Sequence, residues 1–182
     1  MGSYDLGALA HIVRIVGREN RQYSVMLAYD VTLTDLRSEP GVLIGYSTNR
    51  WTPTVLAGTR FQFRTGADGS SVLLVDTKSA HPTSWNSTSS TGQNGMSFGQ
   101  DAGLIARIIS PATGQFELVV AGVGRGGTTA ASEFITNPNY FKQIADIAPP
   151  DWESHNNIEM VVTTDVINGR SGPPHLVRFV AQ

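Results

Sequence analysis

Residues 41–46 have the sequence Gly-Val-Leu-Ile-Gly-Tyr, a continuous apolar run that precedes a polar stretch at 47–53. Runs of this length between turn residues are typical of a strand covered on both faces, as in a parallel sheet. A short helix is expected before the run, at 32–37, because Thr32 is a good capping residue. Another helix is expected after the polar stretch, through Ala57. The run therefore indicates a buried strand between two helices.

The same patterns continue along the chain. Helical spacing of apolar residues predicts a helix over 5–17, with a strand over 11–16 as the alternative. Further strands are expected at 23–28, 60–64, 72–76, 104–109, 116–121, 158–167 and 175–180, and further helices at 128–135 and 137–147. This alternation predicts an α/β fold. We expect a single three-layer domain over residues 1–182, with a mixed, Rossmann-like sheet and helices on both faces.

Length and composition exclude several classes of protein. A chain of 182 residues is long enough for one domain with a sizeable core. The net charge of −2 gives no broad basic surface, so direct contact with nucleic acid is not expected. No apolar run is long enough to span a bilayer, and the absence of cysteine excludes disulfides and thiolate chemistry. The four histidines lack the spacing of zinc ligands, so no metal site is expected.

Residues 79–100 form a long stretch rich in serine, threonine and glycine, with only isolated large apolar side chains. A stretch of this length without secondary structure is either a functional lid or disordered. We expect a loop that is mobile.

A glycine-rich loop follows the strand expected at 116–121 and opens a helix. Its sequence, Gly122-Val123-Gly124-Arg125-Gly126-Gly127, fits the G-x-G-x-x-G pattern, in which backbone N–H groups and the helix dipole bind a phosphate. Gly122, Gly124 and Gly127 would let a ligand approach the backbone closely. Arg125 would pair with the ligand's charge, and Thr128 would add a hydroxyl donor.

Three interpretations of this glycine loop stay open. A dinucleotide site also needs an acid about 20 residues on, and Asp146 has that spacing but lies in an expected helix. The loop would otherwise bind another small anion, or it would only let the helix pack closely against the strand.

A second candidate loop, Ser47-Thr48-Asn49-Arg50, also lies between an apolar strand and a helix. Ser47, Asn49 and Arg50 are candidate ligand-binding residues, since Asn49 would hydrogen-bond a ligand and Arg50 would neutralise it. Alternatively, Asn49 only caps the helix while Trp51 packs beneath it. If the two strands are parallel neighbours, both loops leave the same edge of the sheet, where ligands of open α/β sheets bind.

Several stretches of the sequence resemble, in order along nearly the whole chain, a domain of bacterial multidomain proteins whose function is uncharacterised. The residues that carry the resemblance are 34–37, 42–46, 49–52, 60–63, 113–115, 121–122, 127–128, 130–134, 149–152 and 171–174. In such proteins the domain follows a winged-helix-like DNA-binding region, often with a single membrane segment between the two. The resemblance implies a regulatory domain that is tethered to both and lies outside the cytoplasm. It implies no catalytic residue, cofactor or ligand.

These observations lead to three hypotheses about function. The first is a regulatory or sensory domain that binds a small, anionic molecule at the two strand-to-helix loops. The second is an enzyme acting on a nucleotide or phosphate ester, with Asp76 or Glu133 as acid or base. The third is a protein-interaction module without a small-molecule site. The first depends on whether the turns after Ile44 and Ala121 leave one edge of the sheet.

Overall fold

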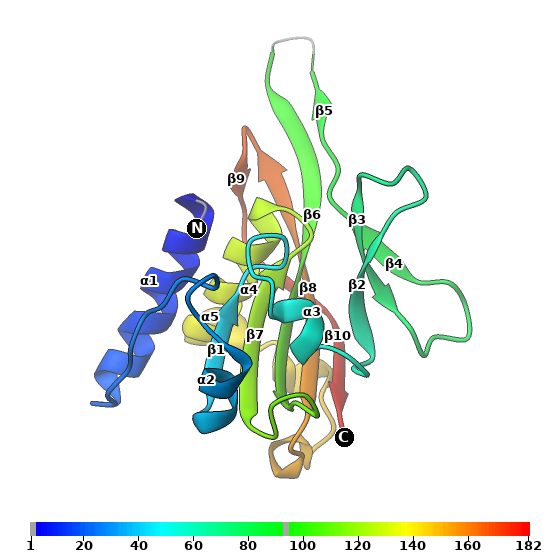
Figure 1. Cartoon of the computed structure of the whole chain (residues 1–182). Coiled ribbons are helices and arrows are strands. Elements are labelled where there is room, and N and C mark those ends of the chain that lie inside the picture. Colours follow the sequence, from blue (N-terminus) through cyan, green and yellow to red (C-terminus); the bar gives the residue numbers. More distant parts are fainter. Residues whose placement is uncertain (1–2, 93–94) are drawn as a thin grey trace.

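Five strands form the main sheet of the computed structural model, which describes residues 3–92 and 95–182, in the order β1-β7-β6-β8-β10 (Figure 1). Their bounds are Gly41–Ile44 for β1, Ser97–Ile109 for β6, Phe116–Gly122 for β7, Ile158–Ile167 for β8 and His175–Ala181 for β10. Two short strands, β5 (Ser90–Thr91) and β9 (Arg170–Ser171), pair with β6 and β8. β1 and β7 are parallel, and the other pairs are antiparallel. The fold is therefore α/β with a mixed sheet, as predicted.

Helices cover one face of this sheet (Figure 1). They are α1 (Ser3–Arg18), α4 (Arg125–Thr136), α5 (Pro138–Phe141), α6 (Ile144–Ile147) and the 3₁₀ helix at Trp152–Ser154. Helix α4 lies on the sheet and α1 packs against α4. The core on this face joins Ile105, Val120 and Met160 of the strands to Ile12 and Phe134 of the helices.

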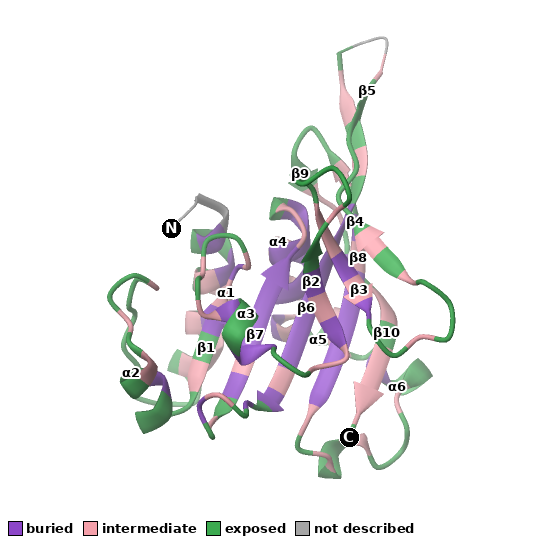
Figure 2. Cartoon of the chain, turned by 45° about the vertical axis from the view of Figure 1, so that its right-hand side comes forward, coloured by how far each residue is buried: buried purple, intermediate pink, exposed green. Residues whose placement is uncertain are grey.

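A small antiparallel sheet covers the other face. It consists of β2 (Phe61–Thr65), β3 (Val72–Asp76) and β4 (Ser84–Asn86), and the four-residue helix α3 (Thr52–Val55) lies beside it. Phe61 and Leu74 are fully buried against the main sheet, whose central strands are buried along most of their length (Figure 2). The prediction of helices on both faces is therefore wrong for this side, where a sheet supplies most of the cover.

The structure confirms most of the predicted elements. α1 confirms the helix at 5–17, and the alternative strand at 11–16 is wrong. Helix α2 (Leu33–Ser38) begins where predicted, because Thr32 and Asp35 form a reciprocal capping box. The helix predicted at 137–147 is instead the two short helices α5 and α6. Between them, Gln143 uses both ends of its amide to bond the backbone of 174 and 176.

The strand predicted at 23–28 is wrong. The segment pairs with no strand, because the main sheet ends at β1. Its side chains are therefore about half exposed, with 53% for Tyr23 and 54% for Val25.

The stretch at 79–100 contains secondary structure, namely β4, β5 and the first residues of β6. Residues 93 and 94 lie outside the described part. Thr88 exchanges hydrogen bonds with Gln100, so the described flanks form a polar hairpin that projects from the body (Figure 1). The mobility of this stretch stays a prediction.

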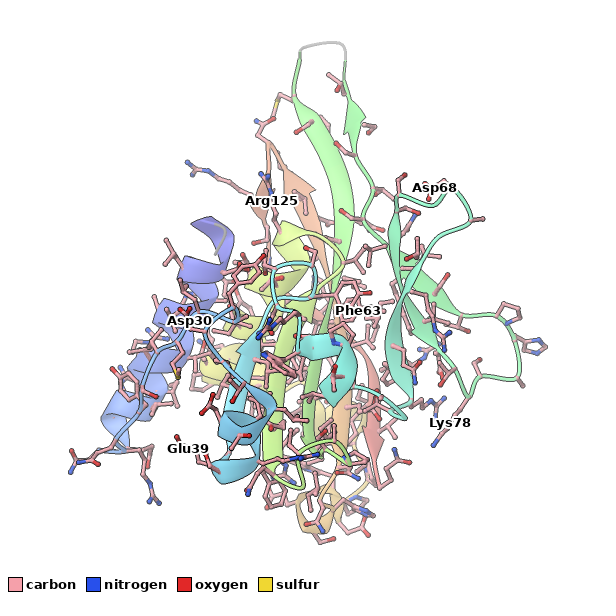
Figure 3. All side chains as sticks on the ribbon, in the orientation of Figure 1. Asp30, Glu39, Phe63, Asp68, Lys78 and Arg125 are labelled. Atoms are coloured by element: carbon pink, nitrogen blue, oxygen red, sulfur yellow. The ribbon has the colours of Figure 1, made fainter. Side chains whose placement is uncertain are left out.

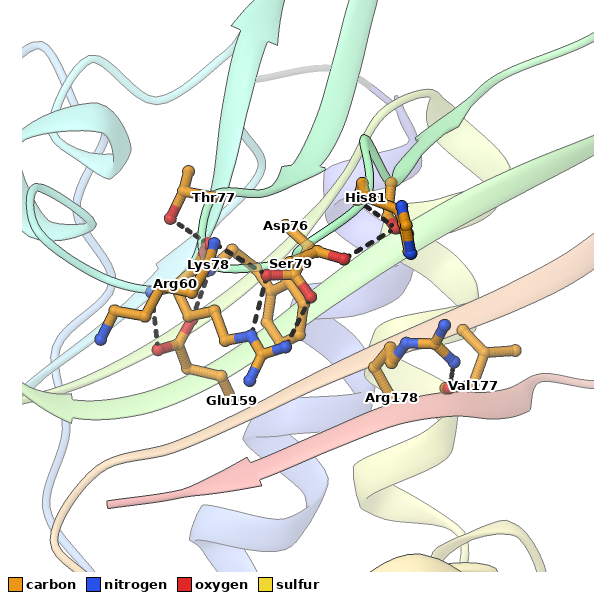
Figure 4. Close-up of polar contacts among 11 residues, drawn as sticks. Arg60, Asp76, Thr77, Lys78, Ser79, His81, Glu159, Val177 and Arg178 are labelled. Carbon is orange, nitrogen blue, oxygen red and sulfur yellow. Dashed lines mark hydrogen bonds and ion pairs between the residues drawn. The ribbon is translucent and has the colours of Figure 1, made fainter.

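A buried carboxylate joins the two sheets (Figure 4). Glu159 of β8 accepts hydrogen bonds from the N–H groups of Arg60 (3.0 Å) and Phe61 (2.8 Å), where β2 begins. Burial raises the pKa of Glu159, although these two N–H groups lower it. The Arg60 side chain forms a bidentate ion pair with Asp76 at the end of β3, with both contacts at 2.8 Å. The start of β2 and the end of β3 are thus held at one point of the main sheet.

Glu117 is a second buried acid, at the beginning of β7 opposite Gly41 of β1. Neither of its carboxylate oxygens receives a hydrogen bond of good geometry within the described residues, although Thr113 and the backbone N–H of Gly41 lie nearby. Desolvation raises the pKa of Glu117, although Thr113 and the backbone of Gly41 lower it. The folded state therefore favours the protonated form, and the ionised form costs stability.

We predict that Glu117→Met stabilises the protein at pH 8 by about 1–3 kcal/mol, because an unpaired buried acid is replaced by an apolar side chain of similar shape. The pKa of Glu117 is higher in the folded state than in the unfolded state, where it is about 4.3. The wild type therefore loses stability as the pH rises from about 4.3 through the folded-state pKa. The gain should therefore shrink at pH 4. Urea denaturation at both pH values measures it, and an equal or lower stability of the variant at pH 8 would contradict the account.

Candidate functional site

The two candidate loops leave the same edge of the main sheet. β1 and β7 are adjacent and parallel, with Ile44 opposite Val120, so the geometric condition for a shared site is confirmed. Gly45 donates its N–H to the carbonyl of Val120 at 2.9 Å and then turns the chain with a φ of +83°, which favours glycine. The chain therefore leaves β1 directly beside the loop that follows β7.

A pocket of about 330 Å³ lies between these loops. It is lined by Asp5, Gly45, Tyr46, Ser47, Thr48, Gly122, Val123, Gly124, Arg125 and Thr128. Of the sequence-predicted site residues, Ser47, Gly122, Gly124, Arg125 and Thr128 are thus brought together. Figure 3 shows Arg125 at this edge, at the start of α4.

Asn49 and Arg50 do not line this pocket. The Asn49 side chain accepts the N–H of Trp51 at 3.1 Å, which closes the turn before α3. Arg50 donates to the carbonyl of Val31 at 2.9 Å and lies 5.0 Å from the centre of the Trp51 ring. Asn49 and Arg50 therefore stabilise the local structure of this turn. This agrees with the alternative interpretation, in which the turn binds no ligand.

The carboxylate of Asp101, from β6, occupies the N-terminus of α4. Its Oδ1 accepts the N–H groups of Gly124 at 2.9 Å and Ala102 at 2.8 Å. Burial raises the pKa of Asp101, while the backbone N–H groups of 124, 126, 127 and 102 lower it. These N–H groups would serve a ligand phosphate in a dinucleotide site, but here they face a carboxylate of the chain itself.

The glycines of the loop also allow close packing. A Cβ at Gly127 would overlap the carbonyl of Ala102, and one at Gly103 would overlap the carbonyl of Gly127. The first turn of α4 thus touches the backbone of β6 directly. Gly127 is therefore a packing residue, and the close-packing interpretation of the glycine pattern is supported.

Sequence reasoning missed Asp5, Tyr46 and Asp101 in this region, and it named Thr48 only as part of the second candidate loop, without a role in binding. Asp5 is 8% exposed, and its Oδ1 lies 3.2 Å from where a Cβ of Gly45 would be. Tyr46 stacks on Phe63 of β2 with 4.4 Å between ring centroids, which joins the pocket wall to the small sheet. The sequence contained a signal for Asp101. It is the one acidic residue between Asp76 and Glu117, and it lies just before the apolar run at 104–109 that predicted a strand.

The acids of the enzyme hypothesis lie outside the pocket. Arg60 lowers the pKa of Asp76 through the bidentate ion pair, so Asp76 is a poor proton acceptor. Glu133 lies within α4 and does not line the pocket either. Within the described ranges, no three His, Cys, Asp or Glu side chains gather as a metal site, and no helix is long and apolar enough to cross a membrane.

Compared with known proteins, the chain matches no family model, no curated protein and no solved structure. The resemblance to bacterial domains behind a DNA-binding region and a membrane segment therefore stays a prediction.

We predict that Asp101→Ala lowers the free energy of unfolding by about 1–3 kcal/mol, since buried N–H groups at the start of α4 lose their acceptor. Sulfate or phosphate should recover part of this loss, because an anion can then occupy the vacated helix N-terminus. Urea denaturation with and without sulfate, at constant ionic strength, measures both effects.

The matched control is Asp165→Ala, which removes an exposed acid from β8. Its stability should respond to sulfate as the wild type does. An equal sulfate response in Asp101→Ala would show that the carboxylate does not act as an internal anion.

Proposed function

We propose that this chain is a regulatory or sensory domain that binds a small polar molecule with an anionic group in the pocket between the β1 and β7 loops. The observation that carries the proposal is that two loops far apart in sequence line one pocket at the carboxyl ends of parallel strands. This is the usual place for ligands in open α/β sheets.

The lining supports a ligand that carries two kinds of polar group. The guanidinium of Arg125 would pair with an anionic group, and the hydroxyls of Ser47, Thr48 and Thr128 would hydrogen-bond it. Asp5 would accept a hydroxyl or ammonium group. Hydroxy acids, amino acids and small sugar phosphates have this chemistry. A volume of about 330 Å³ favours a molecule of this size over a dinucleotide.

Binding is favoured over catalysis for this pocket. Its hydroxyl groups come from Tyr46, Ser47, Thr48 and Thr128, and no histidine or lysine is among the residues that line it. The usual His or Lys base of a nucleophilic hydroxyl is therefore absent from the described lining, and Asp5 is the one carboxylate there. The regulatory role rests in addition on the sequence resemblance to domains carried behind a DNA-binding region.

A thermal-shift panel tests the proposal with inorganic phosphate, a three-carbon sugar phosphate, a 2-hydroxy acid and an α-amino acid. A ligand at about 100 times its Kd adds ~2.7 kcal/mol of stability, which corresponds to a Tm increase of about 5–10 °C for a chain of this length. We expect at least one probe to give such a shift in the wild type and a much smaller one in Arg125→Ala.

The matched control is Arg64→Ala, which removes an exposed arginine from the small sheet. It should keep the full ligand-induced shift. The proposal is wrong if no probe shifts the wild type, or if Arg125→Ala and Arg64→Ala respond alike.

A further inference from the structure

A second, larger cavity lies on the other side of β1. It is an apolar groove of about 400 Å³, lined by residues of α1, of β1 and of the segment 22–29. Leu9, Ile12 and Val16 of α1 line it, and so do Tyr23, Val25 and Leu27 of the segment. Tyr23, Val25 and Leu27 are 53%, 54% and 49% exposed, so the groove keeps large apolar side chains in contact with water.

The strand that borders the groove has an open edge. β1 is the terminal strand of the main sheet. Gly45 donates its N–H to Val120, and the direction of the N–H groups alternates along a strand, so those of Val42 and Ile44 face away from β7. No hydrogen bond from another described strand meets Val42 at this edge. Such an edge is a template for a further strand.

The segment on the far side of the groove does not close this edge itself. Its end is held in place, since the carbonyl of Val31 accepts the Arg50 guanidinium at 2.9 Å and the Trp51 indole N–H at 3.1 Å. Residues 23–27 have no regular secondary structure, residues 28–30 form a turn, and the segment belongs to no ladder. The groove is thus a gap between an open strand edge and an apolar segment.

The charged side chains that line the groove are all acidic, and Arg50 lies beside it, hydrogen-bonded to the carbonyls of Tyr29 and Val31. Asp5, Asp35 and Glu39 line it, and no lysine, arginine or histidine does. Hydrogen bonds from Thr32 lower the pKa of Asp35, which therefore stays ionised. Glu39 projects beside α2, before β1 begins (Figure 3). A partner with basic residues would be complementary to this rim.

We propose that the open edge of β1 takes up an extended, apolar segment of a partner protein as an added strand, with lysine or arginine flanking the apolar residues. Backbone hydrogen bonds to Val42 and Ile44 provide the pairing, and the walls of the groove receive the alternate side chains. A second copy of this chain is disfavoured as the occupant, because it would place the same acidic rim against itself. The strand-addition site borders the pocket between the β1 and β7 loops and shares Asp5 and Thr48 with it, but pairing at the open edge of Val42 does not depend on that pocket's ligand.

The test uses a fluorescent peptide of sequence Lys-Val-Thr-Val-Thr-Val-Lys with blocked ends, measured by anisotropy at low salt. Wild-type protein should bind it, and a peptide with glutamate in place of both lysines should bind about tenfold more weakly. Added salt should reduce this difference. On binding, the amides of Val42 and Ile44 should become protected from hydrogen exchange.

Variants of β1 separate backbone pairing from apolar contact. Val42→Pro removes the outward N–H but leaves the ladder to β7 intact, and proline is tolerated at such an edge position. It should weaken peptide binding at least tenfold, whereas Val42→Thr, which keeps the N–H, should not. Glu39→Lys is a second test for the case that Val42→Pro fails to fold, and it should reverse the preference between the two peptides.

The same experiments would detect a different occupant of the β1 edge. The proposal is overturned if the lysine peptide does not bind at millimolar concentration, or if Val42→Pro binds it as well as Val42→Thr does. It is also overturned if sedimentation shows a dimer that Val42→Pro abolishes, since a second copy then uses the edge. Protection of Val42 in the free monomer would mean that segment 23–28 closes the edge, and this too overturns it.

Discussion

The last hydrogen bond of the β1–β7 ladder, from Gly45 to Val120, lies where two distant parts of the chain turn away from the sheet together. Because this pair is parallel, both turns leave the same edge, and the pocket lies between them. The same pairing makes β1 the terminal strand, so its other side borders the apolar groove. One short strand therefore determines the position of both surfaces.

Buried acids account for much of the polar organisation. Asp101 takes the place that a ligand anion has in many α/β proteins, so the field of the α4 N-terminus is compensated within the chain. The pocket's own charges are then those of Arg125 and Asp5. Glu159 binds two backbone N–H groups and joins the sheets, while Glu117 is buried without such partners. Burial raises the pKa of both acids, but only Glu159 uses its carboxylate to hold backbone N–H groups at the beginning of another sheet.

Local patterns predicted the elements well, and the errors lie in long-range contacts. The apolar run at 41–46 correctly predicted a strand, but the expectation of cover on both faces is wrong, because β1 ends the sheet, only Leu43 of this strand is buried and Val42 is 44% exposed. The segment at 23–28 has a similar composition but lacks a partner strand, which no local pattern reveals. The glycine pattern predicted a helix after β7, but α4 begins at Arg125, three residues before the predicted start at 128, and the carboxylate at its N-terminus, Asp101, comes from another strand. The two runs at 60–64 and 72–76, separated by a turn, predicted strands without indicating that they form a separate layer.

The position of β1 in the chain also bears on the order in which the molecule assembles. β6 and β7 are joined by a tight turn and can pair as a local hairpin, whereas β1 reaches β7 only after the intervening small sheet has folded back. Closing the larger loop costs more chain entropy, and short terminal strands open more easily than central ones. Partial unfolding of the native molecule should therefore dismantle the pocket first, while the central strands β6 and β8 remain paired.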